Sequence, residues 1–154
     1  MTPRGPDVYQ QAMRTALRLL RGRDLTEAEI FTRLLTKGFG EIESKAVVSS
    51  LLRQGYVSDA RIVDRAVEKA VSDRPTGRLR LEMELKARGA KDAAIEHALV
   101  SVSPEQERAI AEREVRRIQS KGGSVSKAGT FLARRGFDTD TIETVLETIY
   151  GSEP

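Results

Sequence analysis

Side chains that could carry out acid–base, nucleophilic or metal chemistry are sparse in this sequence. The 154 residues contain no cysteine and a single histidine, His97. A histidine without cysteines or clustered carboxylates nearby is a poor metal ligand, and any catalytic triad would have to be built around this one imidazole. His97 falls in the middle of an expected helix. We therefore assign it a structural or simply exposed role and predict no metal site.

Carboxylate pairs and phosphate-binding loops give no better basis for catalysis. Glu82 and Glu84, like Asp138 and Asp140, are two residues apart, so the members of each pair point to different faces of a helix. The stretch Lys121-Gly-Gly-Ser124 could cradle a phosphate, but a turn between helices is its more ordinary interpretation, and no Gly-x-x-x-x-Gly-Lys-Ser/Thr motif is present. We therefore predict that the chain is not an enzyme and binds no cofactor.

The chemistry that remains is the binding of anions by arginine and lysine. The formal net charge is only +3, but six basic and two acidic residues lie between Arg74 and Lys91, and eight basic and two acidic residues between Arg108 and Arg135. Such clusters suit DNA phosphates or an acidic protein surface, although solvated helix faces would look the same. The candidate binding residues are Arg74, Arg78, Arg80, Lys86, Arg88, Arg113, Arg116, Arg117, Arg134 and Arg135.

The elements that must position these bases occur three times. Three segments align without gaps: Leu34-Leu-Thr-Lys37-Gly38-Phe39, Leu85-Lys-Ala-Arg88-Gly89-Ala90 and Leu132-Ala-Arg-Arg135-Gly136-Phe137. Their glycines lie 51 and 47 residues apart, and an apolar pair follows each glycine at nine and ten residues. Agreement of this kind indicates an internal repeat.

Each repeat predicts a helix, a tight turn and a second helix. The leucine four residues before the glycine belongs to the buried face, and the glycine can take the left-handed conformation that ends many helices. The base before the glycine complements the negative end of the helix. Helix starts are indicated by capping boxes at Thr26-Glu-Ala-Glu29 and Ser103-Pro-Glu-Gln106, and by Asp138 as a capping residue.

A further amphipathic helix precedes each of these pairs, at about residues 8–21, at residues 59–72 and after Ser103. No segment alternates polar and apolar residues for long enough to indicate a sheet. We therefore predict an all-α fold of three tandem, helix-turn-helix-like repeats of three helices, in an elongated and curved arrangement. The predicted units are residues 1–57, 58–102 and 103–154. Such small units bury little surface alone and should stack on their neighbours.

The composition is consistent with a small helical protein of the cytoplasm. Hydrophobic residues make up 39% and aromatic residues 5%, which is enough for a helical core but thin for an aromatic-lined pocket. No stretch approaches the roughly 20 apolar residues that a membrane-spanning helix needs. No apolar run follows Met1, so no signal peptide is expected. We expect a cytoplasmic monomer without a membrane partner.

The helix-turn-helix-like pairs raise the alternative of a stand-alone DNA-binding protein. A recognition helix that reads bases usually carries Asn, Gln, Ser or Arg in its first turns. Here the expected third helices begin with Gly40-Glu-Ile-Glu43, Lys91-Asp-Ala-Ala94 and Asp138-Thr-Asp-Thr141, which are mostly neutral or acidic. Base reading by these helices is not expected, whereas contact of the basic helices with phosphates stays open.

Three groups of residues resemble the RecX family, the regulators of the RecA recombinase. The stretch Gly77-x-x-Arg80-Leu81-x-x-Glu84-Leu85-x-x-Arg88-Gly89 looks like the central signature of that family. Lys37-Gly38-Phe39 followed by Gly55-Tyr-Val-Ser-Asp59-x-Arg61 resembles the junction between its first and second units. Phe131-Leu132-x-x-Arg135-Gly136-Phe137 resembles its closing unit. In this order and spacing, the motifs cover the chain from about Tyr9 to Tyr150.

Two positions depart from the family pattern. The family usually has Phe-Ala after the Asp-x-Arg motif, where this chain has Ile62-Val63, and it commonly has Ile after the second glycine, where this chain has Ala90. All of these residues are apolar. The departures therefore indicate repacking around the second unit rather than a different fold.

The resemblance implies a negative modulator that binds RecA filaments on single-stranded DNA. Members of the family lie in the helical groove of the filament and inhibit its ATPase, strand-exchange and co-protease activities, which connects them to homologous recombination, DNA repair and the SOS response. The implied partners are the RecA filament and single-stranded DNA, met directly or through the filament. A helical scaffold for another partner is the third interpretation of the same sequence.

Overall fold

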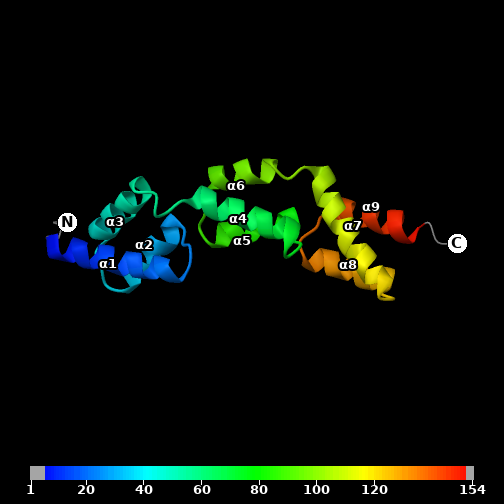
Figure 1. The fold of residues 1–154 in the computed structure, drawn as a ribbon, viewed down its shortest axis with the longest axis horizontal. Coiled ribbons are helices and arrows are strands. Elements are labelled where there is room, and N and C mark those ends of the chain that lie inside the picture. The colour runs from blue at the N-terminus through cyan, green and yellow to red at the C-terminus, as the bar shows by residue number, and fades with distance from the viewer. Residues whose placement is uncertain (1–5, 152–154) are drawn as a thin grey trace.

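The computed structural model describes residues 6–151, which form helices joined by short loops. No strand occurs within that range, so the prediction of an all-α fold is confirmed. Figure 1 shows the helices as three groups placed end to end in a shallow arc. In chain order the helices are α1 (Pro6–Gly22), α2 (Glu27–Thr36), α3 (Glu41–Arg53), α4 (Asp59–Ser72), α5 (Arg78–Ala87), α6 (Asp92–Val100), α7 (Pro104–Ser120), α8 (Val125–Arg134) and α9 (Thr139–Tyr150).

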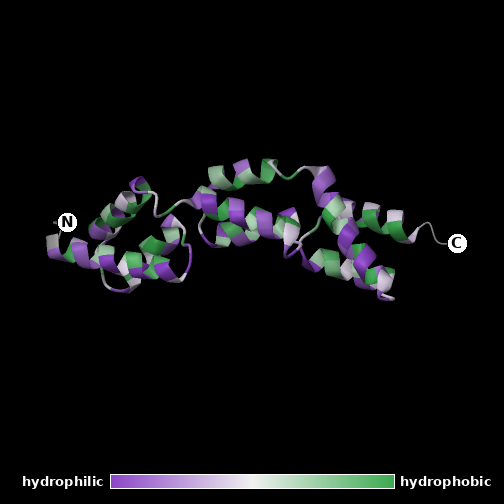
Figure 2. Ribbon diagram, in the orientation of Figure 1, coloured by the Kyte–Doolittle hydropathy of each residue, from purple (hydrophilic) through white to green (hydrophobic). Residues whose placement is uncertain are grey.

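Each group of three helices encloses a hydrophobic core of its own. In every group the first and third helices pack along each other and the second helix closes the triangle. Figure 2 shows that the helices carry both hydrophobic and hydrophilic residues. The most deeply buried side chains include Ile30, Leu34 and Leu51 in the first core, Val63, Leu85 and Ile95 in the second, and Val115, Leu132 and Val145 in the third.

The repeated turns have the predicted geometry. Gly38, Gly89 and Gly136 have φ angles of 95°, 76° and 86°, in the left-handed region that residues with a Cβ atom rarely adopt. The leucines four residues before them are at most 2% exposed. The second and third helices of each group are therefore joined by the same turn, and the threefold repeat is confirmed.

The predicted helix starts are confirmed as well. Thr26 and Ser103 form complete capping boxes with Glu29 and Gln106, and the side chain of Asp138 accepts a hydrogen bond from the Thr141 N–H at 2.7 Å. These caps satisfy backbone donors that the first turn of a helix leaves unpaired. The chain consequently enters α2, α7 and α9 at fixed positions.

Three such groups in a row make the molecule elongated and curved, as expected. In the following text the three groups are called units 1, 2 and 3. The sequence boundaries assigned to them, at residues 57 and 102, remain predictions. The first five and last three residues of the chain, which include its start at Met1, lie outside the described residues.

Candidate anion-binding crevice between units 2 and 3

Several of the ten candidate basic residues hold neighbouring units together. Arg88 is one of them. Its guanidinium donates to the backbone carbonyl of Asp24, in the loop between α1 and α2, at 2.9 Å. It also donates to Glu29 Oε1 at 2.8 Å. Arg88 therefore links unit 2 to unit 1.

Glu29 is adapted to this contact. Burial alone would raise the pKa of its carboxyl, but hydrogen bonds from Arg88 and from the Thr26 N–H, together with the positive charges of Arg88 and Arg23, hold the pKa below its usual value. The carboxylate is charged at neutral pH. A charge-assisted pair of this kind is stronger than a neutral hydrogen bond.

Arg135 makes the corresponding link between units 3 and 2. Its guanidinium donates to the Pro75 carbonyl at 2.7 Å and to Thr76 Oγ1 at 2.9 Å, both in the loop between α4 and α5. Burial, followed by the like charges of Arg80 and Arg74, lowers the pKa of Arg135. An arginine stays protonated despite such a shift, so the positive charges at this junction remain close together.

Arg80 and Arg78 also lie at the second junction. Arg80 pairs with Glu84 at 2.8 Å and donates to the Arg134 carbonyl of unit 3, also at 2.8 Å. The backbone N–H of Arg78 donates to the buried carboxylate of Glu107 in α7 at 3.0 Å, while its guanidinium lies 3.3 Å from the Leu99 carbonyl. Both residues therefore help to fix α5 in place.

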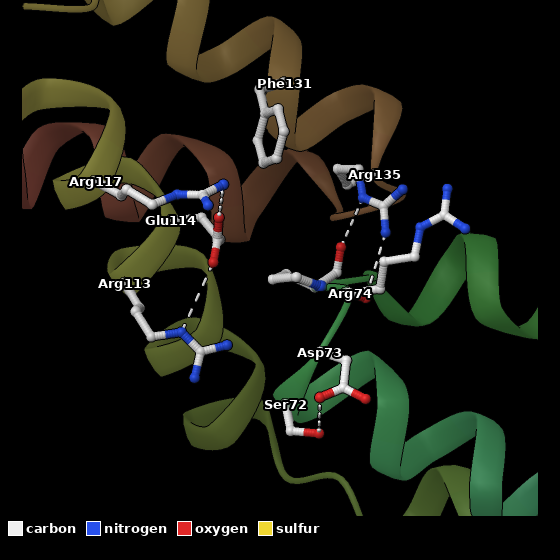
Figure 3. A pocket seen from close by; sticks show the side chains of 9 residues that line it. Ser72, Asp73, Arg74, Arg113, Glu114, Arg117, Phe131 and Arg135 are labelled. Carbon is white, nitrogen blue, oxygen red and sulfur yellow. Dashed lines mark hydrogen bonds and ion pairs between the residues drawn. The ribbon is translucent and has the colours of Figure 1, made fainter. Parts of the chain in front are cut away.

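Arginines of both units, Arg135 among them, line a crevice of about 380 Å³ at this junction. One wall is α7, which carries Arg113, Glu114 and Arg117. The opposite wall is the end of α4 with the following loop, and the end of α8 closes the crevice beside the ring of Phe131 (Figure 3). Four arginines and two carboxylates line it: Arg74, Arg113, Arg117, Arg135, Asp73 and Glu114.

The contacts inside the crevice leave its positive charge only partly neutralised. Arg117 lies 2.7 Å from the buried carboxylate of Glu114, in an ion pair rather than an aligned hydrogen bond. Arg113 donates to the Val71 carbonyl of unit 2 at 2.9 Å. The side chain of Arg74 is exposed and pairs with no other described residue.

This arrangement can bind an anion. Each guanidinium has five N–H donors, so Arg113 and Arg117 keep donors that their internal contacts do not use. Planar guanidinium groups on two facing walls suit a phosphate or a carboxylate, which they can hold through paired hydrogen bonds. The structure thus brings together four of the ten candidate residues: Arg74, Arg113, Arg117 and Arg135.

The other candidates lie elsewhere. Lys86 pairs with Glu82 on the exposed face of α5 at 3.0 Å. Arg116 is exposed on α7. Arg134 is exposed beside a second groove that contains Leu79 and Met83. Contact of these ten residues with DNA or with another protein remains a prediction.

Sequence reasoning missed the carboxylates that clamp the junctions. Asp59 accepts hydrogen bonds from the backbone of Glu27 and Lys91 at 3.0 and 3.1 Å, and Glu107 accepts from the backbone of Arg78. Asp59 and Glu107 are 5% and 7% exposed. Both come near the start of a first helix, where acidic residues are common caps, so the sequence carries no signal that separates these two from ordinary helix starts.

The structure offers no metal centre in the range that it describes. His97 is exposed on α6, and no three acidic or imidazole side chains of residues 6–151 come close enough to hold an ion together. None of the helices in that range is both long and apolar enough to cross a bilayer.

Comparison with known proteins relates the chain to one family. Residues 12–51 match a family model described as the first three-helix domain of RecX. The regulatory protein RecX of Chromohalobacter salexigens is 32% identical over 130 residues, which cover 82% of this chain and 85% of the relative. The regulatory protein RecX of Chlorobaculum tepidum is 34% identical over 145 residues, which cover 92% and 90%.

Solved structures with the same fold carry the same name. The crystal structure of RecX from Lactobacillus salivarius superimposes with a TM-score of 0.81 at 17% identity, over 94% of this chain and 97% of that chain. A second crystal structure, of a regulatory protein RecX, gives 0.77 at 19% identity, over 90% and 73%. At 17% and 19% identity, the likeness establishes the fold of this chain alone, three helical units in a row.

Proposed function

The chain belongs to the RecX family of regulatory proteins, and from this premise we propose that it is a negative modulator of the RecA recombinase. It binds in the helical groove of the RecA filament on single-stranded DNA and inhibits ATP hydrolysis, strand exchange and co-protease activity. Its roles then lie in homologous recombination, DNA repair and the SOS response, in the cytoplasm.

The observation that carries the proposal is the extended row of three linked units, each with its own core. A RecA filament presents the same surface on every protomer. A row of similar units can touch several protomers at once, and contacts that are weak singly then combine through high effective concentration. The protein needs no catalytic group for this, because occupation of the groove is itself the inhibitory step.

The arginine crevice supplies a second contact of defined chemistry. It takes an anionic group of the nucleoprotein filament, either a DNA phosphate or a carboxylate of a protomer. Because the crevice opens between units 2 and 3, a group bound there contacts both units at once. Binding in the crevice would therefore favour one relative placement of the two units.

The experiment that tests the function is a titration of the purified chain into DNA-dependent ATP hydrolysis by RecA. We expect inhibition at amounts well below one regulator per DNA site. An unchanged hydrolysis rate at saturating regulator, with no regulator found in sedimented filaments, would refute the proposal.

The alternative of a stand-alone DNA-binding protein makes a different prediction. It requires tight binding to duplex DNA in the absence of recombinase. Acidic side chains in the first turns of the third helices oppose this: Glu41 and Glu43 in α3, Asp92 in α6 and Asp140 in α9. Negative charge there repels phosphates, so we expect duplex affinity to be weak.

A further inference from the structure

The two junctions inside the chain are built in the same way. At each junction, the base that precedes the left-handed glycine donates to a backbone carbonyl of the preceding unit. That carbonyl lies three residues before the start of the unit's second helix. Arg88 donates to Asp24 at 2.9 Å, and Arg135 donates to Pro75 at 2.7 Å. The first acceptor lies three residues before α2 and the second lies three residues before α5.

Two further contacts recur. The capping residue of the preceding unit's second helix donates to the backbone carbonyl of the same base, through the Thr26 hydroxyl at 2.8 Å and through the Gly77 N–H at 2.6 Å. The first N–H of that helix donates to a buried carboxylate of the following unit, Asp59 at the first junction and Glu107 at the second. One junction design therefore joins unit 2 to unit 1 and unit 3 to unit 2.

Both halves of this junction are left open at the ends of the molecule. In unit 1, Lys37 occupies the position of Arg88 and Arg135, is exposed, and pairs with no other side chain that the structure describes. In unit 3, the carbonyl three residues before α8 belongs to Gly122, and the capping residue is Ser124. Both are exposed, whereas Thr26 is fully buried at the first junction.

We propose that successive copies of this chain dock head to tail on the RecA filament by repeating this junction. The Lys37–Gly38 turn of one copy packs on the Lys121–Ser124 loop and the start of α8 of the copy before it. Lys37 donates to the Gly122 carbonyl, and the hydroxyl of Ser124 donates to the Lys37 carbonyl. An interface between two different surfaces of the same chain continues from copy to copy instead of closing as a dimer.

The charges at the two open ends match those that the second junction already accommodates. Arg135 lies close to Arg74 and Arg80, four residues before and two residues after the start of α5. The corresponding positions around α8 are Lys121 and Lys127. At the existing junction backbone carbonyls accept the hydrogen bonds of the base, so like charges around it do not prevent the contact.

The terminal junction is weaker than the internal ones. At the internal junctions the buried carboxylates, Asp59 and Glu107, come from the first helix of the following unit. At the terminal junction that helix is α1, and the one acidic residue in its first turn, Asp7, is exposed. Without the covalent linkage between units, a few hydrogen bonds do not overcome the entropy of association, so dilute protein is monomeric. The inference rests on the proposed function, because the filament aligns neighbouring copies and raises their effective concentration.

Cross-linking of single-cysteine variants tests the arrangement, because the natural chain contains no cysteine. Thr36→Cys places a thiol beside Lys37 without removing it, and Lys121→Cys places one on the opposite end. The two variants are mixed, bound to RecA filaments and treated with a short bismaleimide. The matched control replaces Lys121→Cys by Val100→Cys, since Val100 is 77% exposed at the end of α6, in the middle of the molecule.

Head-to-tail docking predicts at least about tenfold more cross-linked dimer from the first pair than from the control pair. It also predicts little dimer from Thr36→Cys alone. Equal yields from the two pairs would overturn the inference. If the variants do not sediment with filaments, the proposed function fails instead, and the same comparison is made with the regulator alone at millimolar concentration, where the ratio of yields again decides.

Two changes at Lys37 separate docking from simple proximity on the filament. Lys37→Ala removes the donor and should reduce the yield of the first pair to that of the control. Lys37→Arg restores the residue found at both internal junctions and should raise the yield. Neither change should alter inhibition by saturating regulator. A yield that is insensitive to both would show that Lys37 makes no contact.

Discussion

Arg88 and Arg135 occupy the same position in successive repeats, and each donates to a backbone carbonyl at the same position of the preceding unit. A base at this position complements the negative end of its own helix, and in addition it joins two units. Some bases of this chain join the units, and others are available to a partner. Arg113 and Arg135 do both, because each donates across the second junction and lines the crevice.

Arg88→Ala should weaken the junction between units 1 and 2. The change leaves the mostly buried carboxylate of Glu29 without its strongest partner and the Asp24 carbonyl without a donor. Loss of such contacts costs about 1–3 kcal/mol. We expect the free energy of unfolding to fall by this amount and the urea midpoint to fall with it, while helical content is retained in native buffer. Lys86→Ala, on the exposed face of the same helix, should leave the midpoint unchanged.

The same contact should make stability depend on pH below neutrality. The pKa of Glu29 is lowered from an ordinary value of 4.5, because its hydrogen bonds and neighbouring cations outweigh the effect of burial. A carboxyl with a depressed pKa contributes its full stabilisation above 4.5, and this contribution is lost as the pH falls through the pKa of the folded state.

Glu29→Gln keeps an oxygen that can accept from the Thr26 N–H but removes the charge. We expect the native chain to exceed this variant in urea midpoint at pH 7, and the difference to shrink steadily as the pH falls below 4.5. A constant difference between pH 7 and pH 3 would contradict the assignment.

Gly77 should tolerate no side chain, although its backbone angles are ordinary. A Cβ atom there would overlap the backbone of Gly136 and Phe137 in unit 3. Gly77→Ala should therefore destabilise the protein by about 1–3 kcal/mol, because the two units must move apart. Gly22→Ala is the control, since a Cβ atom at the end of α1 meets nothing within 4 Å. It should be neutral or stabilising by up to about 1 kcal/mol. Thermal unfolding of both variants checks this.

The fold within each unit could be predicted from local signals, and the junctions between units could not. A leucine four residues before a glycine and a threonine three residues before a glutamate each report on one turn of chain, so the caps and left-handed turns were predicted at the right residues. Arg88, in contrast, reads as a base at a helix end. Its acceptor is 64 residues away in the sequence and is determined by how two units pack.

The candidate site was predictable only in composition. Clustered arginines around residues 113–117 and 134–135 indicate an anion-binding surface. They do not show that Arg117 pairs with a buried Glu114, or that Arg74 joins the crevice from another unit. Alignment of the three repeats offers one usable signal. A base that occurs at the same position in all three repeats indicates a structural role in the repeat rather than a contact with a partner.

The core of unit 1 contains one polar position that the repeat fills with isoleucine elsewhere. Ser44 corresponds to Ile95 and Ile142, is fully buried, and its hydroxyl has no hydrogen-bond partner among the described residues. Ser44→Ala should stabilise the protein by about 1 kcal/mol, because a buried unpaired hydroxyl is removed. Ser50 on the same helix is the contrast, since its hydroxyl accepts from Gln54 at 2.8 Å. Ser50→Ala should not stabilise, and an equal gain from both changes would contradict the explanation.

Arg74→Glu tests whether the crevice meets an anion of the filament. Arg74 is the one crevice arginine whose side chain has no partner in the described part of the chain, so its reversal leaves the junction contacts of Arg135 in place. If it contacts a DNA phosphate, affinity for the filament should fall, and the slope of log affinity against log salt should decrease by about 1.

Arg14→Glu is matched in charge and lies on the exposed face of α1, far from the crevice. Equal losses from both variants would reduce the effect to net charge. A loss confined to Arg74→Glu without a change in salt slope would assign the crevice to a carboxylate of a RecA protomer, because a carboxylate releases no condensed counterions.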